Sequence, residues 1–403
     1  MSLLDLLSEE SIWISFYDYK TSLISHSGFE KELRRFIISK SYLPVCNRIR
    51  NGEAFPLPER KVINKNSYKK KRVVYTYPQN ENMVIKLLTH LILRKYDSLF
   101  CNNLYSFRPS RNAKDAVRRF VTDPGIKSSF FYKSDISNYF NSVPIQRLTP
   151  MLKDVLFDDP ELCGFLCGLL EENCVTERGS VIDDRKGIMA GTPLSAFYAN
   201  LYLRELDAWF NKRRIAYARY SDDIIVFAGE QNQVETYADH IKETLREMGL
   251  CMNPDKELYG RPEDGWTFLG FSSQGEVIDI SPVTVGKIKA KMRRKTRALR
   301  RWQTRNGLSG ENSASAFIRI FNKKLLDSPV DNELSWSCWF FPVINTVDSL
   351  RDIDHYAQDC IRYLVSGKRT KSRYNVRYND MKRLGYKNLV HEYYSFNGSS
   401  DNT

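Results

Sequence analysis

The chain has 403 residues, 42% of them hydrophobic and 13% aromatic, which is enough to bury a sizeable core and excludes a disordered protein. Its net charge of +13 favours a polyanionic partner, because cations that neutralise phosphates release counterions. The sequence shows no long apolar run and no basic leader, which argues against a membrane or secreted protein. Its eight cysteines lack zinc-type spacing, which favours free thiols in a reducing cytoplasm.

The first third of the chain alternates between helical and β-rich patterns. Residues 1–60, rich in Leu, Ile and aromatics, predict a helical extension that packs or contacts a partner. Between residues 61 and 75, a polar turn with a run of cations separates two β-rich segments, as in a solvated hairpin tip. Residues 82–100 predict a helix with one apolar face. Arg108 then precedes Pro109 at a helix entrance, where an arginine can simply bond loop carbonyls.

Three carboxylates are the best candidates for chemistry. Asp222 and Asp223 lie between two alternating apolar runs, which predicts a β-hairpin with both acids at its tip. An isolated Asp-Asp pair is most often a surface turn. Asp135, however, follows the short apolar strand of residues 130–132 and supplies a further carboxylate. A divalent metal would relieve the repulsion among the three acids, so the combination favours a metal site.

Glycines mark the segments before and after this hairpin. Within residues 187–203, Gly191 permits close backbone approach and Pro193 suits the start of a helix. A phosphate-binding loop is a weaker interpretation, because no Gly-Lys-Ser/Thr follows. Residues 234–248 predict an amphipathic helix capped by Gly249.

The other long segments are predicted to be helical. Residues 147–176 mix polar and apolar positions, whereas residues 283–305 are strongly basic. Residues 316–365 contain tryptophans and phenylalanines that indicate a helical core. The basic and aromatic residues 368–394 suit single-stranded RNA or a packed helix equally. The five histidines are dispersed, which argues against a histidine metal site or a Ser-His-Asp triad.

Together these segments resemble reverse transcriptases, in particular the bacterial lineage of group II intron, retron and defence-associated enzymes. The matching runs, in family order, are Phe107-Arg-Pro-Ser-Arg111, Asp135-Ile-Ser-Asn-Tyr-Phe140, Gly187-Ile-Met-Ala-Gly-Thr-Pro-Leu-Ser195, Tyr220-Ser-Asp-Asp223, Leu250-Cys-Met-Asn-Pro-Asp-Lys256 and Thr267-Phe-Leu-Gly-Phe271. Met189-Ala190 stands where the intron enzymes have Pro-Gln, which puts a glutamine contact in doubt and separates this chain from intron maturases.

The resemblance implies an α+β right-hand polymerase with fingers, a palm whose antiparallel sheet bears the Tyr-Ser-Asp-Asp hairpin, and a helical thumb. The expected parts are an N-terminal helical extension (1–60), fingers (61–125), palm (126–279, with a fingers-associated insertion at about 147–190), thumb (280–370) and a basic C-terminal segment (371–403).

The resemblance also implies two Mg²⁺ ions. Asp135 and Asp222 would bridge the ions, Asp223 would support them, and Ile136 would offer its backbone carbonyl. One ion would lower the pKa of the primer hydroxyl, and the other would neutralise the leaving pyrophosphate.

Further residues are assigned to substrates by the same resemblance. The expected dNTP-binding residues are Lys65, Arg72, Phe140, Gly191 and Lys256. Lys71 could replace Arg72 as a phosphate clamp, and Phe140, the expected steric gate against a 2′-hydroxyl, could instead be plain core. The expected template and primer contacts are Arg108, Arg111, Ser195, Gly270, Lys291, Arg294 and Arg297.

The implied function is an RNA-directed DNA polymerase that copies a structured non-coding RNA from dNTPs into a DNA/RNA hybrid, in cytoplasmic antiphage defence and without a membrane. No nuclease motif or zinc cluster is visible in the sequence. Two alternatives stay open: an untemplated or protein-primed DNA polymerase of abortive-infection type, and an RNA-binding maturase with little catalysis.

Overall fold

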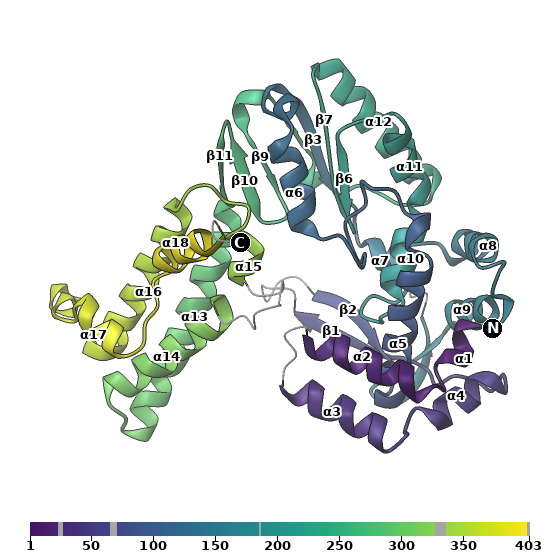
Figure 1. Cartoon of the computed structure of the whole chain (residues 1–403), viewed down its shortest axis with the longest axis horizontal. Coiled ribbons are helices and arrows are strands. Elements are labelled where there is room, and N and C mark those ends of the chain that lie inside the picture. The colour runs from purple at the N-terminus through teal and green to yellow at the C-terminus, as the bar shows by residue number, and fades with distance from the viewer. Residues whose placement is uncertain (23–26, 65–70, 185–186, 327–335, 401–403) are drawn as a thin grey trace. The chain divides into compact units, whose positions relative to one another are not determined.

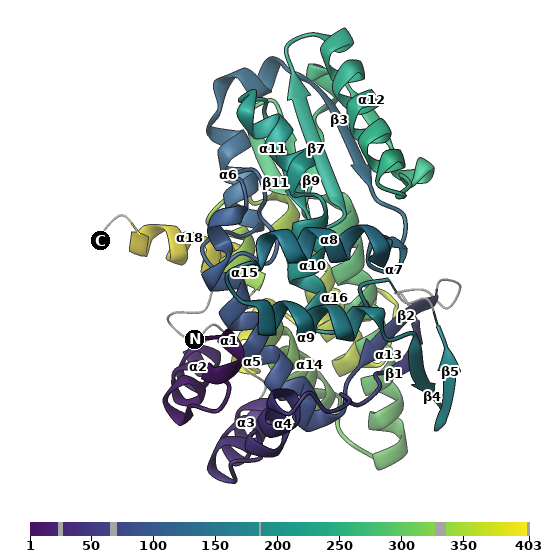
Figure 2. The ribbon, with the colours of Figure 1, turned by 90° about the vertical axis from the view of Figure 1, so that its right-hand side faces the viewer.

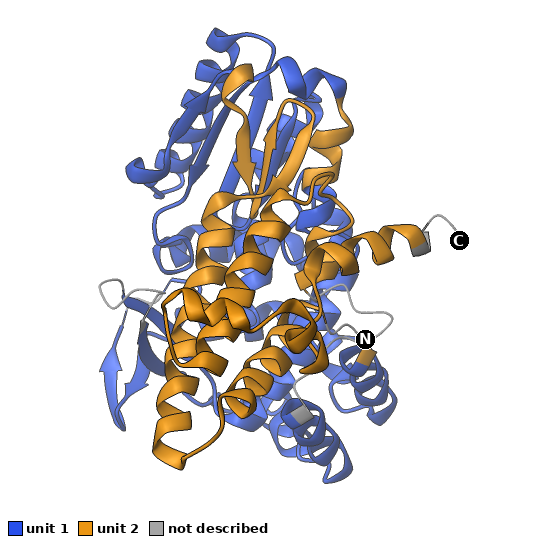
Figure 3. Cartoon of the chain, turned by 90° about the vertical axis from the view of Figure 1, so that its left-hand side faces the viewer, with its two compact units in different colours: residues 1–21, 25–116, 124–261 blue, residues 22–24, 117–123, 262–403 orange. Residues whose placement is uncertain are grey.

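The computed structural model describes residues 1–22, 27–64, 71–184, 187–326 and 336–400. Backbone contacts group the chain into two compact units (Figure 3). Unit 1 comprises residues 1–21, 25–116 and 124–261, and unit 2 comprises residues 22–24, 117–123 and 262–403. The finer division into fingers, palm and thumb segments stays a prediction.

The helices of unit 1 surround two sheets. They are α1 (Leu3–Leu6), α2 (Glu10–Ser22), α3 (Ser27–Ile38), α4 (Leu43–Arg50), α5 (Gln79–Lys95), α7 (Tyr139–Ser142), α8 (Ile145–Val155), α9 (Pro160–Glu171), α10 (Ser195–Tyr202), α11 (Arg204–Lys212) and α12 (Gln231–Glu247), with 3₁₀ turns η1 (Asp97–Leu99), η2 (Pro124–Ser128) and η3 (Pro254–Lys256). The N-terminal helices pack around Trp13, which is fully buried and stacks on Tyr42 with 5.1 Å between ring centroids. This apolar centre accounts for the predicted helical extension.

The first sheet of unit 1 has the strand order β2-β1-β4-β5. Its strands are β1 (Glu59–Asn64), β2 (Lys71–Thr76), β4 (Cys174–Glu177) and β5 (Ser180–Asp183). The antiparallel β1–β2 pair was expected from the sequence, and β4 joins it in parallel at Glu59 and Thr176. The β4–β5 hairpin was not expected: α9 ends at Glu171, so the predicted helix of residues 147–176 gives way to a strand.

The second sheet of unit 1 has the order β6-β7-β3-β8, and every pairing in it is antiparallel. Its strands are β6 (Tyr217–Tyr220), β7 (Asp223–Ala228), β3 (Phe130–Asp135) and β8 (Leu258–Gly260). The central strands β3 and β7 are apolar along most of their length, and Tyr132, Ile224 and Val226 are fully buried. Helix α12 runs along this sheet, beside β3 and β7 (Figures 1 and 2).

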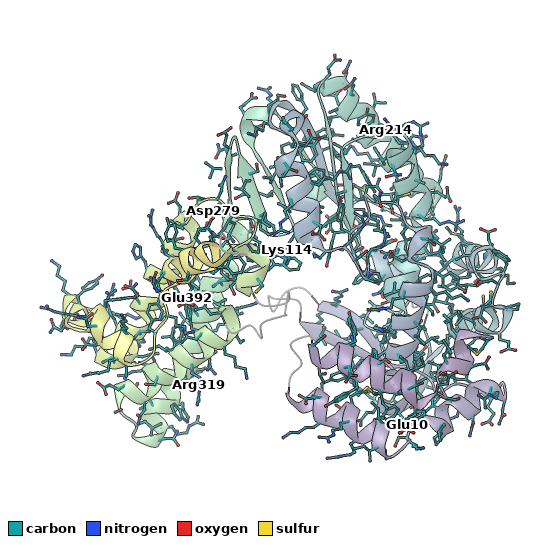
Figure 4. The ribbon with its side chains drawn as sticks, in the orientation of Figure 1. Glu10, Lys114, Arg214, Asp279, Arg319 and Glu392 are labelled. Carbon is teal, nitrogen blue, oxygen red and sulfur yellow. The ribbon has the colours of Figure 1, made fainter. Side chains whose placement is uncertain are left out.

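Unit 2 combines a small sheet with a helical bundle. It contains β9 (Trp266–Phe268), β10 (Phe271–Gln274), β11 (Val277–Ile280), α13 (Pro282–Asn306), α14 (Gly310–Leu325), α15 (Trp336–Phe340), α16 (Asp348–Ser366), α17 (Tyr378–Arg383), α18 (Leu389–Ser400), η4 (Pro262–Asp264), η5 (Lys371–Asn375) and the C-terminal part of α6 (Ala113–Thr122). Asp279 of β11, labelled in Figure 4, accepts hydrogen bonds from the backbone N–H and the hydroxyl of Ser349, so it ties the sheet to α16.

The predicted fold class is confirmed: helices combine with antiparallel sheets, and a hairpin of the β6–β7 sheet carries Tyr-Ser-Asp-Asp. The predicted helices at residues 234–248 and 283–305 correspond to α12 and α13. Within the described ranges, none of the helices has both the length and the apolarity to span a bilayer.

Candidate active site

The three carboxylates singled out in the sequence converge at one end of the β6-β7-β3-β8 sheet. Asp135, the last residue of β3, pairs directly with Asp223, the first residue of β7. Asp222 lies in the two-residue turn between β6 and β7, whose first residue, Ser221, has a φ of +60°. Ligand oxygens of the three acids lie within 4.8 Å of one another. Strand register therefore produces the cluster, because it pairs two acids that are 88 positions apart in sequence.

Backbone hydrogen bonds hold this end of the sheet. The N–H of Ile136 donates to the carbonyl of Asp222 at 3.0 Å, which joins the end of β3 to the turn. The N–H of Asn253 donates to the carbonyl of Asp135 at 2.8 Å, and the N–H of Ser137 donates to the carbonyl of Cys251 at 2.9 Å. The segment that leads to η3 is thereby fixed against β3, and this places Lys256 beside the acids.

The electrostatics of the site are those of crowded acids with two nearby cations, Lys133 and Lys256, whose charges both act to lower the pKa of Asp223. Burial, and then the charges of Asp222 and Asp135, raise the pKa of Asp223 to about 6. The Nζ of Lys256 donates to the Oδ1 of Asp135 at 2.5 Å. Burial alone would lower the pKa of Lys256, but the hydrogen bond and charge of Asp135 outweigh it, so the pKa is raised. The ammonium is thus held charged.

The donor set fits a hard divalent cation. All three side chains offer carboxylate oxygens, the ligands that such cations prefer, and the cluster contains no histidine or cysteine. Asp135 is buried, and Asp222 and Asp223 are partly exposed, so one side of the cluster remains open to a substrate. A cation there would also stabilise the ionised form of Asp223 against its raised pKa.

A buried ion pair supports the hairpin from behind, and sequence reasoning missed it. Arg219 of β6 donates from Nε and Nη2 to the two carboxylate oxygens of Asp207 in α11, at 2.9 and 2.5 Å. Nη1 of Arg219 also donates to the carbonyl of Ser221 in the turn at 3.3 Å. The available signal was a charged residue inside an otherwise apolar strand, whose burial requires a partner.

A second buried contact fixes the same turn. The backbone N–H of Ser221 donates to the Oγ of Ser106 at 2.9 Å, and this hydroxyl donates to the Oδ1 of Asn200 in α10 at 3.0 Å. Asn200 returns a hydrogen bond from its Nδ2 to the carbonyl of Ser106 at 2.8 Å. All three side chains are buried, so the network is shielded from water and sets the position of the turn.

Phe140, the expected steric gate, lies in α7 and is half-buried. Its carbonyl accepts from the N–H of Ile188 at 2.8 Å. A Cβ on Gly187 would lie 2.5 Å from that carbonyl oxygen, so only glycine fits there. The ring of Phe140 lies 6.4 Å from the ring of Phe107, edge to face. Its role in sugar selection stays a prediction.

The loop that contains Gly191 contacts the first sheet. The carbonyl of Ala190 accepts from the N–H of Tyr75 in β2 at 2.8 Å. Gly191 has a φ of +104°, and a Cβ there would lie 3.1 Å from the carbonyl oxygen of Tyr75. Ser195 is buried and its hydroxyl donates to the carbonyl of Thr192 at 2.6 Å, at the start of α10. Contacts of Gly191 and Ser195 with substrates stay predictions.

The expected cations of the fingers differ in their surroundings. Lys65 lies outside the described residues, whereas Lys71 and Arg72 are exposed at the start of β2. Arg108 is almost fully buried and donates to both carboxylate oxygens of Asp97 and to the carbonyls of Phe100 and Cys101. This geometry fits the alternative in which Arg108 holds the loop.

Arg111 donates to the backbone carbonyl and the side chain of Asn102, and is partly exposed. The remaining expected contacts belong to unit 2. Gly270, with a φ of +92°, lies in the turn between β9 and β10. Lys291, Arg294 and Arg297 are exposed on α13. Their contacts with nucleic acid stay predictions.

Comparison with known proteins agrees with this geometry. The family model described as "Reverse transcriptase (RNA-dependent DNA polymerase)" matches residues 63–273, more than half of the chain. Protein YkfC of Escherichia coli (strain K12) is 23% identical over 259 residues, which cover 55% of this chain and 68% of YkfC.

Solved telomerase structures are similar at low identity. Apo telomerase from Candida tropicalis has a TM-score of 0.46 and 11% identity, over 82% of this chain and 68% of that chain. Telomerase from Candida albicans in complex with a TWJ fragment of telomeric RNA has a TM-score of 0.45 and 12% identity, over 83% and 67%. The C-terminally truncated C. tropicalis enzyme has a TM-score of 0.45 and 13% identity, over 56% of this chain and 55% of that chain. The match therefore spans little more than half the length of that enzyme.

The match of the family model and the three acids brought together by strand register concern the same part of the chain. That part contains the hairpin with Asp222 and Asp223 and the strand that ends at Asp135. The chain therefore belongs to the reverse transcriptase family, the RNA-dependent DNA polymerases.

Proposed function

We propose that this chain is a cytoplasmic reverse transcriptase that copies a structured non-coding RNA into cDNA, in antiphage defence. The observation that carries the polymerase activity is the convergence of Asp135, Asp222 and Asp223 beside Lys256. The defence role rests on the resemblance to defence-associated enzymes and on Met189-Ala190, which separates the chain from intron maturases.

We assign two Mg²⁺ ions to the acidic cluster. Asp135 and Asp222 would hold both ions, Asp223 would complete the carboxylate set, and Ile136 would contribute its carbonyl. When bound, the ions would activate the primer 3′-hydroxyl and neutralise charge on the triphosphate. The carboxylates meet the donor requirement, since Mg²⁺ takes oxygen ligands.

The chain's own residues would orient the substrates and move a proton. The pKa of Lys256 is raised, so its Nζ carries a proton that it would deliver to the leaving pyrophosphate. Arg72 would contact the triphosphate from β2, and Phe140 would exclude a 2′-hydroxyl. One short loop connects β2, which contains Arg72, with α7, which contains Phe140. In this loop the carbonyl of Ala190 accepts a backbone hydrogen bond from β2, and the N–H of Ile188 donates one to α7.

An RNA partner is supported by cations that lack carboxylate partners. In unit 1, the ring of Tyr19 lies 5.3 Å from the Nζ of Lys20 and 4.6 Å from the Cζ of Arg94, and the Nζ of Lys86 lies 4.7 Å from the ring of Phe29. Burial, together with the charges of Lys86 and Arg94, lowers the pKa of Lys20. Among the described residues, none of these three cations forms an ion pair. RNA phosphates would relieve their repulsion.

The test is sequencing of the nucleic acid that copurifies with the wild type, with Asp222→Ala and with the control Asp239→Ala, which removes an exposed acid of α12. We expect one RNA in all three samples, and complementary DNA only in the wild type and the control. DNA without a complement in that RNA would indicate untemplated or protein-primed synthesis. Identical samples, with Asp222→Ala fully active in the cell, would favour a maturase.

A further inference from the structure

Phe107 adopts a backbone conformation that its side chain disfavours. Its φ is +55°, in the left-handed region, where a bulky aromatic residue is a genuine outlier. Phe107 is nevertheless 39% exposed, so burial of its ring offsets little of the free-energy cost of this conformation. Conformations of this kind persist where the surroundings impose them, and they gather at functional sites.

The residues on both sides of Phe107 impose this conformation. The N–H of Tyr105 donates to the carbonyl of Arg219 at 3.0 Å, and Ser106 accepts from the N–H of Ser221. On the other side, Arg108 is held by Asp97 through a two-pronged ion pair. The loop is therefore docked on the catalytic hairpin before Phe107 and on η1 after it, which leaves the ring pointing out between the two attachments.

The ring of Phe107 contacts two aromatic residues of the candidate active site. It is 6.4 Å from the ring of Phe140 at an interplanar angle of 83°, and 6.5 Å from the ring of Tyr220 at 37°. Tyr220 immediately precedes the turn with Asp222, and Phe140 lies five positions after Asp135. Phe107 thus contacts one ring from α7 and one ring from the catalytic hairpin.

We propose that Phe107 is a positioning residue for nucleotide incorporation, which completes with Phe140 and Tyr220 an apolar platform for the sugar of the incoming deoxynucleotide. The proposal rests on the proposed function and deepens it. Through its edge-to-face contact, Phe107 restricts the orientations of the Phe140 ring. Through its exposed face, it offers an apolar surface that a deoxyribose can contact. A 2′-hydroxyl placed against that surface would lose its water without gaining a hydrogen-bond partner.

The test compares Phe107→Gly with Phe107→Tyr in nucleotide incorporation on a short RNA template with a DNA primer. Glycine adopts positive φ freely, so Phe107→Gly relieves the strain and should keep the melting temperature at or above that of the wild type. We expect it to raise the KM for dNTP about tenfold and to reduce the preference for dNTP over rNTP, with a smaller change in kcat. Phe107→Tyr, which keeps the ring, should restore both values.

Phe157→Ala is the matched control, because it removes the ring of another phenylalanine, which is 80% exposed just after α8. A melting temperature that falls in parallel with activity in Phe107→Gly would show a packing role and overturn the proposal. So would wild-type KM and wild-type sugar selectivity in that variant. Failure of the wild type itself to incorporate nucleotides would instead overturn the proposed function, and this inference with it.

Discussion

Arg219 and Asp207 form a two-pronged ion pair directly behind the turn that contains Asp222, with side chains that are 0% and 1% exposed. Asp207 also accepts a hydrogen bond from the hydroxyl of Tyr217 at 3.0 Å, and Arg219 reaches the carbonyls of Ser221 and Asn200. Both charges are therefore compensated within the core. The pair connects α11, α10 and the turn, so buried groups of the core fix the turn that contains Asp222.

Removal of one partner of this pair should destabilise the protein strongly. Arg219→Met or Asp207→Asn leaves an uncompensated buried charge, and we expect a loss of about 3–5 kcal/mol in the free energy of unfolding. The measurement is urea denaturation with the slope checked against the wild type. Arg351→Met, which breaks an exposed pair with Asp348, should cost less than about 1 kcal/mol. Equal effects of the buried and exposed variants would contradict this account.

Lys256→Ala should impair catalysis more than folding. Its ammonium forms an ion pair with Asp135 of the acidic cluster and carries the proton for the leaving group in our proposal. We expect single-turnover incorporation to fall about 10²- to 10⁴-fold, the usual range for a general acid. Lys242→Ala is the control, since Lys242 likewise pairs with a carboxylate, that of Glu257, which is not one of the three clustered acids. Similar rates in the two variants would remove Lys256 from the chemistry.

The β6-β7-β3-β8 sheet was predictable from sequence because the apolar runs of its central strands are easy to recognise. The apolar runs of β3 and β7 end at Asp135 and begin at Asp223, so the acids mark the edge of the buried region. Long helices such as α12 and α13 have clear periodicity or charge. The β4–β5 hairpin lacked such signals: its strands have four residues each, and Arg178-Gly179 occupies a turn with both φ values positive, where Asn-Gly is the usual signature.

The supporting structure of the site could not be predicted from local patterns. From the sequence, Arg219 indicates only that a buried partner must exist. That this partner is Asp207 follows from the packing of α11 against β6. Ser106 and Asn200 are 94 positions apart and meet through tertiary structure alone. Arg108 matched a family motif, but its ion pair with Asp97 depends on the 3₁₀ turn η1, which was not predicted from the sequence. Motifs locate the candidate acids, whereas the groups that hold them in place are set by the fold.

Gly191→Ala should be destabilising although it adds a single methyl group. The residue has a φ of +104°, and the new Cβ would lie 3.1 Å from the carbonyl oxygen of Tyr75, a backbone atom. We expect a loss of about 1–3 kcal/mol in the free energy of unfolding. Gly229→Ala is the control, since a Cβ there meets nothing within 4 Å. A stability of Gly191→Ala equal to that of the control would show that the loop can move away from β2 freely.

His90 should make stability depend on pH between about 3 and 6.5. Burial, and then the charges of Arg94 and Lys20, lower the pKa of His90 to about 3, and its ring packs against Phe16 and Tyr19. An unfolded histidine titrates near about 6.5. As the pH falls through this window, the unfolded chain binds a proton that the native state does not, so stability must decrease.

Urea denaturation at several pH values should show that the free energy of unfolding depends less on pH in His90→Gln than in the wild type. Arg94→Met should move the native pKa of His90 upward in an NMR titration, and an unchanged value would contradict the assigned cause.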